Sequence, residues 1–428
     1  MERINRKRLL QKNFWTNFRN SAIFYALLIA LAFSSCEKPL PKVGLTEGVW
    51  RGQITAQNNQ IPFNFNVEKQ EGVYSITLIN GDEELEIDDV NIIGDSLFFN
   101  MHIFDISIRA EMKGDSLKGT YTKNYAENYV LPFEAAHNKP GRFDNVSSSS
   151  AFDGTWETTF YSQDGNETPA VGIFKAEEGI LKGTFLTKTG DYRFLDGYTE
   201  QDTMHLYTFD GNHIYKFKAH KESDSILKGE YWSGKTSYKT FVSKKNDTVS
   251  LPDANTLTYL KEGYDRIDFS FPDLEGKQVS LTDEKYKDKV VVLQIFGTWC
   301  PNCMDETRFL SDWYRKNADQ GVEIIGLAYE IKPDFDYARE RVLTMKEKLD
   351  VPYDFLIAGT STTESASESL PMLNRVMSFP TSIIIDRKGE VRRIHTGFSG
   401  PATGVYYEEF VDDFNQFMKA LIEESDAS

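Results

Sequence analysis

The stretch Val290-Val291-Val292-Leu293-Gln294-Ile295-Phe296, followed closely by Trp299-Cys300-Pro301-Asn302-Cys303, decides the fold of the C-terminal part of this chain. An almost unbroken apolar run that is rich in valine predicts a strand buried on both faces. Beyond the second stretch, aromatic and aliphatic residues return at helical spacing: Phe309, Leu310, Trp313 and Tyr314. The sequence therefore predicts a strand, a tight turn and a helix, with Cys-x-x-Cys at the start of the helix.

Two cysteines at a helix start predict a redox pair. The N-terminus of a helix presents unpaired N–H groups and the positive end of the helix dipole, which favour a thiolate at Cys300. Cys303 follows one turn later, where its sulfur can attack a mixed disulfide formed at Cys300. A purely structural disulfide is not expected here, because so short a loop constrains the unfolded chain very little.

Metal binding is not expected at this motif. A zinc site would need two more ligands, and the chain has no second Cys-x-x-Cys and no pair of histidines at zinc-ligand spacing. The six histidines are scattered along the sequence. We therefore expect neither a metal nor any other cofactor.

The remaining cysteine, Cys36, follows a segment typical of export signals. Residues 1–20 carry six basic side chains, and residues 22–33 form an apolar run of 12 residues, which is too short to span a bilayer. The run ends in Ala32-Phe33-Ser34-Ser35-Cys36, which resembles a bacterial lipoprotein signal, although Phe33 departs from the usual aliphatic residue. The resemblance implies a signal peptide over 1–35, a lipidated Cys36 and a tether over 36–43. An uncleaved anchor helix is the alternative, and both place the body outside the cytoplasm.

Composition limits the partners of the exported part. Without residues 1–35 the chain keeps 42 basic and 64 acidic side chains, a formal charge of −22. Such a surface repels nucleic acid and anionic lipid headgroups, so we expect no nucleic-acid partner. A length of 428 residues predicts two to four domains.

Two all-β modules are predicted before the cysteine motif. β module 1 covers residues 44–138 and β module 2 covers 152–245, with a polar linker at 139–151 and another at 246–265. In β module 1, short alternating segments lie between Asn, Gly and Asp turns. These segments are 50–54, 62–68, 73–79, 96–101, 106–112 and 117–121. Each module is expected to be a small antiparallel barrel or sandwich.

The second module repeats the order of motifs in the first. Gly48-Val49-Trp50 recurs as Gly154-Thr155-Trp156, 106 residues later, and Glu71-Gly72-Val73 recurs as Glu178-Gly179-Ile180, 107 residues later. A slowly growing offset in unchanged order is what a duplicated domain with small loop insertions produces.

The modules are rich in aromatic residues. Aromatic residues at every second position of a strand, such as Phe63 and Phe65, usually belong to the core of a sheet. We favour a spacer role in which the modules also pack on the catalytic domain; a ligand pocket and a docking surface stay open as alternatives.

Residues 266–428 change to alternating strand and helix signals. We expect a short hairpin over 267–281, a second buried strand over 322–328 and a charged helix over 334–349. A hairpin over 381–396 and a closing amphipathic helix over 407–423 follow. Strands that alternate with helices predict an α/β sheet covered on both faces.

This C-terminal part resembles the thioredoxin-like TlpA/ResA group of extracytoplasmic thiol–disulfide oxidoreductases. The matching pieces are Phe-x-x-Pro-Asp-Leu-x-Gly-Lys-x-Val-x-Leu over 269–281, Trp-Cys-x-x-Cys, Phe379-Pro380-Thr381 before a strand, and Gly397-Phe398. The resemblance covers less than half of the chain and does not extend to the β modules.

The resemblance also implies roles for single residues. Pro380 is expected to be a cis-proline beside the dithiol, where neighbouring backbone groups stay free to hold a substrate strand. Thioredoxins have a buried aspartate where this chain has Gln294, so another base must serve Cys303. Glu330 matches a family glutamate and is the expected proton carrier, unless it only caps the following loop. Glu306 also matches the family's helix pattern.

Together these features predict a membrane-anchored thiol–disulfide oxidoreductase of the cell envelope, facing the periplasm or exterior. The family favours reduction of oxidised protein thiols, with a membrane electron donor that reduces Cys300 and Cys303 again. A peroxiredoxin-like thiol peroxidase is one alternative, but Gly297 stands where its Thr or Ser would be. A non-catalytic binding protein with a redox-responsive domain is another, against which the intact dithiol argues.

Overall fold

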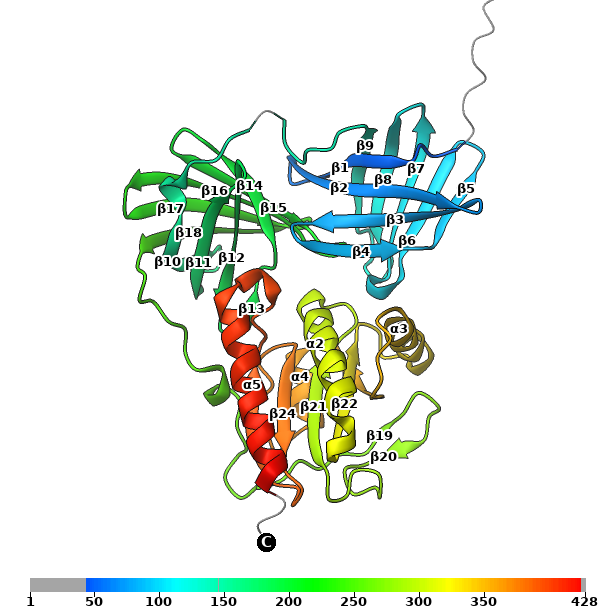
Figure 1. Cartoon of the computed structure of the whole chain (residues 1–428), viewed down its shortest axis with the longest axis vertical. Coiled ribbons are helices and arrows are strands. Elements are labelled where there is room, and N and C mark those ends of the chain that lie inside the picture. The colour runs from blue at the N-terminus through cyan, green and yellow to red at the C-terminus, as the bar shows by residue number, and fades with distance from the viewer. Residues whose placement is uncertain (1–43, 145, 425–428) are drawn as a thin grey trace, which may run out of the picture. The chain divides into compact units, whose positions relative to one another are not determined.

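The computed structural model describes residues 44–144 and 146–424, which form two nine-stranded sheets, a two-stranded ribbon and a five-stranded sheet (Figure 1). The expected signal peptide, the tether and the lipidation site Cys36 lie outside the described residues. Within these residues, no helix is long and apolar enough to cross a membrane.

The first sheet is an antiparallel meander in the order β4-β3-β2-β1-β9-β8-β7-β6-β5. Its strands are β1 (Gly48–Ala56), β2 (Asn59–Gln70), β3 (Val73–Asn80), β4 (Glu83–Ile87), β5 (Val90–Ile93), β6 (Ser96–Met101), β7 (Ile106–Lys113), β8 (Ser116–Lys123) and β9 (Val130–His137). Alternate residues of β2 face the core: Ile61, Phe63, Phe65 and Val67 are each at most 2% exposed. All six segments predicted for this module are strands, whereas β4, β5 and β9 were not predicted.

The second sheet closes on itself, because β11 pairs with β12 as well as with β10. Its strands are β10 (Gly154–Ser162), β11 (Glu167–Glu177), β12 (Ile180–Thr187), β13 (Gly190–Asp191), β14 (Leu195–Glu200), β15 (Thr203–Phe209), β16 (Ile214–Ser223), β17 (Ile226–Ser233) and β18 (Ser237–Lys245). The aromatic residues Phe160, Phe185, Phe217 and Phe241 fill its core. The N-terminal sheets are therefore barrel-like and all-β.

Equivalent positions of the two sheets have the same local structure. The indole Nε1 of Trp50 donates to the carbonyl oxygen of Thr46 at 2.9 Å, and the Nε1 of Trp156 donates to the carbonyl oxygen of Phe152 at 2.9 Å. Both Glu-Gly turns of the repeat also have two successive residues with positive φ. These similarities support a duplication, which stays a prediction.

The C-terminal part has a thioredoxin-like fold. Its sheet, in the order β23-β22-β21-β24-β25, consists of β21 (Val290–Phe296), β22 (Val322–Glu330), β23 (Asp354–Thr360), β24 (Thr381–Ile385) and β25 (Val391–Thr396). Its helices are α2 (Pro301–Asn317), α3 (Phe335–Lys348), α4 (Thr363–Ser369) and α5 (Val405–Glu423). The hairpin predicted over 267–281 is the ribbon of β19 (Phe271–Pro272) and β20 (Gln278–Val279). Five 3₁₀ turns are also described: His102–Phe104, Ser150–Phe152, Ala254–Thr256, Ala318–Gln320 and Pro401–Thr403.

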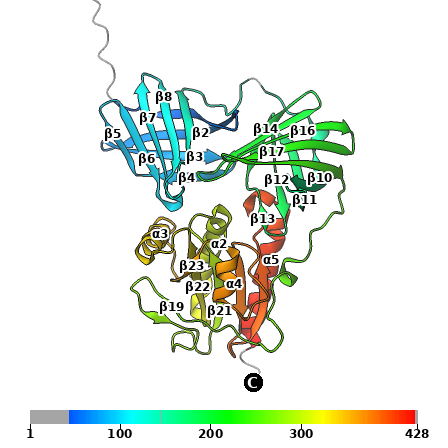
Figure 2. The same cartoon turned by 180° about the vertical axis from the view of Figure 1, so that it is seen from behind.

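Both faces of this sheet are covered, as predicted. All seven residues of β21 are buried. Val290, Val292 and Phe296 pack in one core with apolar residues of α2, α3 and α5 (Figure 1). Val291, Leu293 and Ile295 pack in a second core with Ala366 of α4. Figure 2, the view from behind, shows α4 on this side of the sheet. β23 and α4 are the elements of this part that were not predicted.

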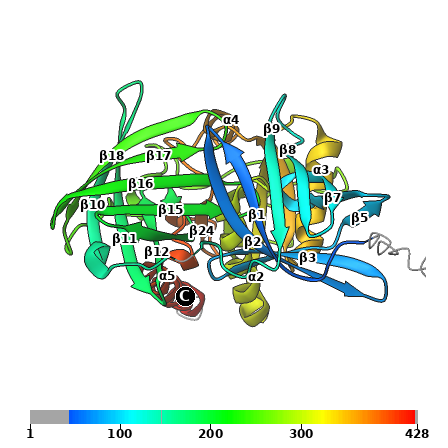
Figure 3. The ribbon, with the colours of Figure 1, turned by 90° about the horizontal axis from the view of Figure 1, so that it is seen from above.

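The apolar cores do not stop at the module boundaries. β2 of the first sheet packs against β15 of the second (Figure 3), and the rings of Phe63 and Phe209 have centroids 4.3 Å apart. Tyr207 and Ile214 of the second sheet, and Met304 of α2, belong to the same apolar cluster as Phe63. Side chains from three parts of the chain therefore build one core beside α2.

Candidate active site

The dithiol lies where β21 ends and α2 begins. A disulfide joins Cys300 to Cys303, with 5.2 Å between their Cα atoms. Cys300 is the N-cap of α2, and its Sγ accepts a hydrogen bond of 3.2 Å from the backbone N–H of Cys303. Pro301 follows at the start of the helix, where its missing N–H costs no hydrogen bond. Cys300 is 7% exposed and Cys303 is fully buried, so Cys300 is the one open to a substrate.

Phe379 and Pro380 lie beside the disulfide. The peptide bond between them is cis, as the family resemblance implied. The carbonyl oxygen of Phe379 is 3.6 Å from Cys300 Sγ. The ring of Phe379 also meets the Trp299 indole edge to face, with centroids 5.5 Å apart. The structure thus brings Pro380 and the two cysteines together.

Glu330 is the last residue of β22 and is 1% exposed. Its carboxylate accepts hydrogen bonds from the backbone N–H of Thr298 at 2.8 Å and from Thr298 Oγ1 at 2.9 Å. Burial raises the pKa of Glu330 to about 7, although both hydrogen bonds act in the opposite direction. Glu330 therefore holds the segment that leads into Cys300, and its carboxyl titrates near neutral pH.

A second buried carboxyl, Glu306, lies one turn after Cys303 on α2. Its Oε1 accepts a hydrogen bond from Ser382 Oγ at 2.7 Å, and its Oε2 accepts one from Gln294 Nε2 at 2.9 Å. Burial raises the pKa of Glu306 to about 7, and hydrogen bonds from Ser382 and Gln294 oppose this shift. The Nε2 of Gln294 also lies 3.4 Å from the carbonyl oxygen of Cys303. Gln294 therefore connects Glu306 to the backbone of Cys303.

β module 2 contacts the cysteine motif directly. The Nδ2 of Asn212 donates to the carbonyl oxygen of Trp299 at 2.7 Å, and the Nδ2 of Asn302 donates to the carbonyl oxygen of Asp191 at 3.1 Å. On the other side of the dithiol, Ser378 Oγ donates to the carbonyl oxygen of Thr189 at 2.8 Å. No sequence pattern indicated these particular contacts; only the general expectation that the modules pack on the catalytic domain applied to them.

Gly397 shows how closely the two parts approach. A Cβ at this position would lie 2.8 Å from the backbone carbonyl carbon of Thr189, and the residue has a φ of +82°. A side chain here would collide with backbone that cannot move aside easily. Gly397 was one of the residues that carry the family resemblance, which did not explain why a glycine stands there. The close contact with β module 2 explains the need for glycine in this chain.

A cleft of about 460 Å³ opens over Cys300 between these parts. One side is formed by Trp299, Cys300, Pro301, Asn302 and Phe379 of the thioredoxin-like part. The other side is formed by residues of β module 2: Thr168, Thr187, Thr189, Gly190, Asp191, Tyr192, Asn212, His213, Tyr215 and Lys239. The cysteine is therefore reached through a composite, largely polar cleft.

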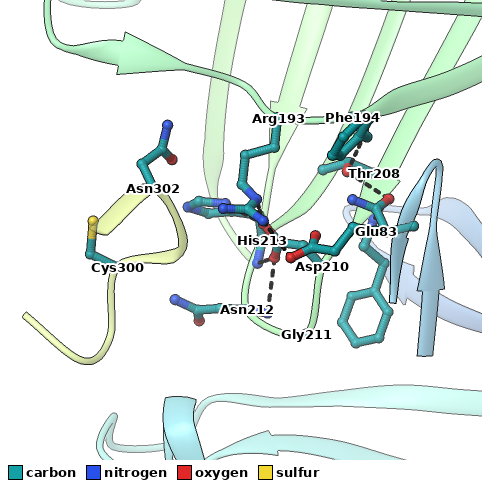
Figure 4. A network of polar contacts seen from close by, with 12 residues as sticks. Glu83, Arg193, Phe194, Thr208, Asp210, Gly211, Asn212, His213, Cys300 and Asn302 are labelled. Atoms are coloured by element: carbon teal, nitrogen blue, oxygen red, sulfur yellow. Dashed lines mark hydrogen bonds and ion pairs between the residues drawn. The ribbon is translucent and has the colours of Figure 1, made fainter. Parts of the chain in front are cut away.

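A buried ionic cluster lies behind this cleft (Figure 4). Arg193, 1% exposed, forms ion pairs with Glu83 of β4 at 2.5 Å, Asp305 of α2 at 2.6 Å and Asp210 at 3.1 Å. Burial disfavours the charge of Arg193, but the three carboxylates hold its pKa above the ordinary value. Burial raises the pKa of Asp305, and the neighbouring Glu83 and Asp191 add to this while Arg193 opposes it. The cluster connects both β modules to the helix that bears the dithiol.

No group of three or more His, Cys, Asp or Glu side chains in the described part of the chain has the arrangement of a metal site. The buried carboxylates near the dithiol are instead bound to Arg193, Thr298 and other protein donors.

Residues 263–394 match the AhpC/TSA family. The thiol–disulfide oxidoreductase ResA of Bacillus thuringiensis subsp. konkukian (strain 97-27) is 32% identical over 129 residues, which are 30% of this chain and 66% of that protein. The ResA protein of Halalkalibacterium halodurans is 28% identical over 161 residues, 37% of this chain and 78% of that protein. Among solved structures, a thiol–disulfide oxidoreductase from Bacteroides fragilis NCTC 9343 is 21% identical, with a TM-score of 0.26, over 34% of this chain and 99% of that one.

The chain thus spans 66% of the length of the first of these relatives. The family match lies in the C-terminal part, which contains the dithiol, Glu330 and Pro380. The relatives are named as thiol–disulfide oxidoreductases.

Proposed function

We propose that this protein is a thiol–disulfide oxidoreductase of the cell envelope that reduces disulfides of other proteins through Cys300 and Cys303. The observation that supports this most directly is the pair itself. A slightly exposed Cys300 caps a helix, a fully buried Cys303 lies within disulfide distance, and Pro380 lies beside them.

The geometry supports the following order of steps in the exchange. In the reduced protein, the Cys300 thiolate attacks a substrate disulfide, because it is the accessible sulfur and accepts a hydrogen bond from the Cys303 N–H. The Cys303 thiolate then attacks Cys300 Sγ and releases the second substrate thiol. The backbone of Phe379 beside the dithiol offers hydrogen-bonding groups to an extended substrate strand.

The cellular setting is part of the proposal. The basic N-terminus, the apolar run and Cys36 support export and attachment to a membrane through a lipid. A membrane electron donor would then reduce the dithiol after each cycle. Membrane fractionation of wild type and Cys36→Ala tests the anchor: a wild-type protein found only in the aqueous fraction would rule it out.

The reduction potential of the Cys300–Cys303 couple tests the direction of the reaction. We expect a potential near that of thioredoxin, about −270 mV, because the family resemblance favours a reductant. Equilibration of the full chain with a thiol buffer of known potential measures it. A value near that of DsbA, about −120 mV, would make the protein an oxidant.

Glu330→Gln should change the pH dependence of the exchange. The pKa of Glu330 is near 7, so its carboxyl is mostly ionised only above that pH and can then take the proton of Cys303. The wild-type rate should therefore rise through about pH 7. The variant should lose this rise and be about ten-fold slower at pH 7.5, because Cys303 must then ionise unaided, with a thiol pKa of about 8.5. Rapid-mixing kinetics from pH 5.5 to 9 measure the profile.

Glu306→Gln is the matched control, since Glu306 is also buried and also has a pKa near 7. If Glu306→Gln lost the increase in rate through pH 7 while Glu330→Gln kept it, Glu306 would be the base instead.

A change in fold stability should not obscure the effect of Glu330→Gln on the rate. A carboxyl whose pKa is raised by burial costs stability as pH increases from about 4.5 to 7, so Glu330→Gln should unfold no more easily than wild type above pH 7.

A thiol peroxidase is not proposed. A peroxidase of that kind needs a hydroxyl side chain three residues before its reactive cysteine, and Gly297 has none. A Cβ at Gly297 would lie 2.2 Å from Trp299 Nε1, so this position is packed against the indole. The disulfide between Cys300 and the nearby Cys303 is instead the arrangement expected of a protein that exchanges disulfides through a dithiol.

A further inference from the structure

We propose that β module 2 completes the active site, and that His213 in its wall of the cleft carries the proton from Cys300 to the thiolate that leaves the substrate. The inference rests on the proposed function, since it concerns the same dithiol. It also assigns a catalytic part to a module for which the sequence favoured a spacer role and left a ligand pocket and a docking surface open.

His213 is held close to the dithiol by a short chain of hydrogen bonds. It lies in the turn between β15 and β16. The carboxylate of Asp210 accepts hydrogen bonds from the backbone N–H groups of Asn212, at 3.1 Å, and His213, at 2.7 Å, which fixes the turn. The side chain of Asn212 then donates to the carbonyl oxygen of Trp299, the residue before Cys300. Figure 4 shows His213 and Asn212 on the side of the ionic cluster toward Cys300.

The imidazole is oriented for proton transfer. Its Nδ1 lies 2.9 Å from Asp210 Oδ2, and its ring stacks on Tyr215 with centroids 4.7 Å apart. The other nitrogen, Nε2, has no hydrogen-bond partner among residues 44–144 and 146–424, and 25% of the side chain is exposed. A histidine whose Nδ1 is held by a carboxylate presents Nε2 to a reacting group. The cleft that His213 lines is the one that contains Cys300.

The charges around His213 favour this arrangement. Burial alone would raise the pKa of Asp210, but His213 and Arg193 together hold it well below its ordinary value. Asp210 is therefore ionised, and its carboxylate oxygen faces Nδ1 of the ring. The other charged side chains that line the cleft, Asp191 and Lys239, belong to the same wall as His213. Nε2 can thus accept a proton and give it back.

The proton and electron balance of the step is complete. Nε2 takes the proton of the Cys300 thiol, and the thiolate attacks one sulfur of the substrate disulfide. A bond forms between Cys300 Sγ and that sulfur, the substrate S–S bond breaks, and its electron pair leaves on the second sulfur. His213 gives its proton to that sulfur and returns to the neutral form. Cys303 then gives its proton to Glu330 and attacks Cys300 Sγ. The bond between Cys300 Sγ and the first substrate sulfur breaks, and that sulfur leaves with the electron pair and takes up the proton. The dithiol is thereby oxidised and the substrate is reduced by two electrons.

The composite cleft also restricts the substrate. A volume of about 460 Å³ lies in the range of roughly 300–1,000 Å³ that is typical of small-ligand sites. Seven of the fifteen lining residues carry hydroxyl, amide or phenol groups, so the walls mix polar and apolar surface. We expect such a cleft to favour a disulfide on an extended segment of a substrate protein or peptide over a disulfide buried inside a folded domain.

His213→Gln in the full chain tests the proton transfer. Two probes are used with the reduced protein: glutathione disulfide, a peptide disulfide, and dithiobis(nitrobenzoate), an aryl disulfide. The thiolate of an alkyl thiol, whose pKa is about 8.5, is a poorer leaving group than an aryl thiolate and gains more from a proton donor. We expect His213→Gln to reduce the peptide disulfide about 100-fold more slowly, because both proton transfers are lost. The aryl disulfide should be reduced only about ten-fold more slowly, because its leaving group needs no proton and only the deprotonation of Cys300 is affected.

His220→Gln is the control, because His220 is exposed on β16 and does not line the cleft; it should match wild type with both probes. Equal losses with both probes in His213→Gln would mean that His213 only supports the structure, and wild-type rates with both would mean that it transfers no proton. Either result overturns the inference and leaves the proposed function intact. A wild-type protein that reduces neither probe would overturn the proposed function as well.

Discussion

Replacing Cys300 with serine is expected to abolish disulfide reduction, and replacing Cys303 with serine is expected to stop the reaction half-way. A serine hydroxyl at position 300 cannot form a disulfide with a substrate, so the rate of disulfide reduction should fall to that measured without the protein. With Cys300 present and Cys303 absent, the first exchange still occurs because Cys300 is the accessible sulfur. The mixed disulfide then has no neighbouring thiolate to resolve it.

Non-reducing electrophoresis and mass spectrometry of the Cys303→Ser protein measure the trapped species. The adducts should be lost when reductant is added and should be absent from the Cys300→Ser protein. An active Cys300→Ser variant, combined with no adducts in Cys303→Ser, would reverse the two roles.

Arg193→Met is expected to be the most destabilising single change outside the apolar cores. It would leave Glu83, Asp210 and Asp305 buried with their main cationic partner removed. Breaking a buried ion pair from one side typically costs about 3–5 kcal/mol, because the remaining charge is desolvated without compensation. Chemical denaturation measures the free energy of unfolding. The loss should be larger at pH 8 than at pH 5, because burial raises the pKa of Asp305 to about 7, so its carboxyl is neutral at the lower pH and needs no cationic partner.

Arg51→Met provides the comparison. Arg51 pairs with Asp144 at 2.8 Å, but the Asp144 side chain is 68% exposed. Ion pairs of this kind contribute about 0–1 kcal/mol, so this variant should unfold almost like wild type. Similar losses in the two variants would show that the Arg193 cluster is no more important to the fold than a surface pair.

The elements that the sequence predicted are those with a strong local signal. The buried run before Cys300 and the helix after it are continuous in sequence, and the turns of β module 1 are marked by Asn, Gly and Asp. Three of the missed elements, β4, β5 and α4, have weaker signals. β5 has no buried residue, so its sequence need not alternate between apolar and polar residues. In α4 only Ala366 is buried. β4 is five residues long and carries three glutamates.

The residues of the candidate site also fall into those that the sequence could predict and those that it could not. The cysteines could be assigned from the motif, and Pro380 and Glu330 from the family resemblance. Arg193, Asn212 and His213 could not, because each is an ordinary polar residue in a turn until the fold is known. Arg193 is 112 residues from Asp305, and Asn212 is 87 residues from Trp299. Their roles depend on tertiary packing, which no local pattern in one sequence encodes.

The ionic cluster limits which chimeric proteins would work. A hybrid that joined residues 44–265 to the thioredoxin-like domain of a relative would bring Arg193 against a helix without a guaranteed carboxylate at the position of Asp305. It would also bring Thr189 against a residue that need not be glycine, as Gly397 is here. Exchange of these parts between proteins would therefore require Asp305 and Gly397 to be transferred together with the β modules, although both lie beyond the linker at 246–265.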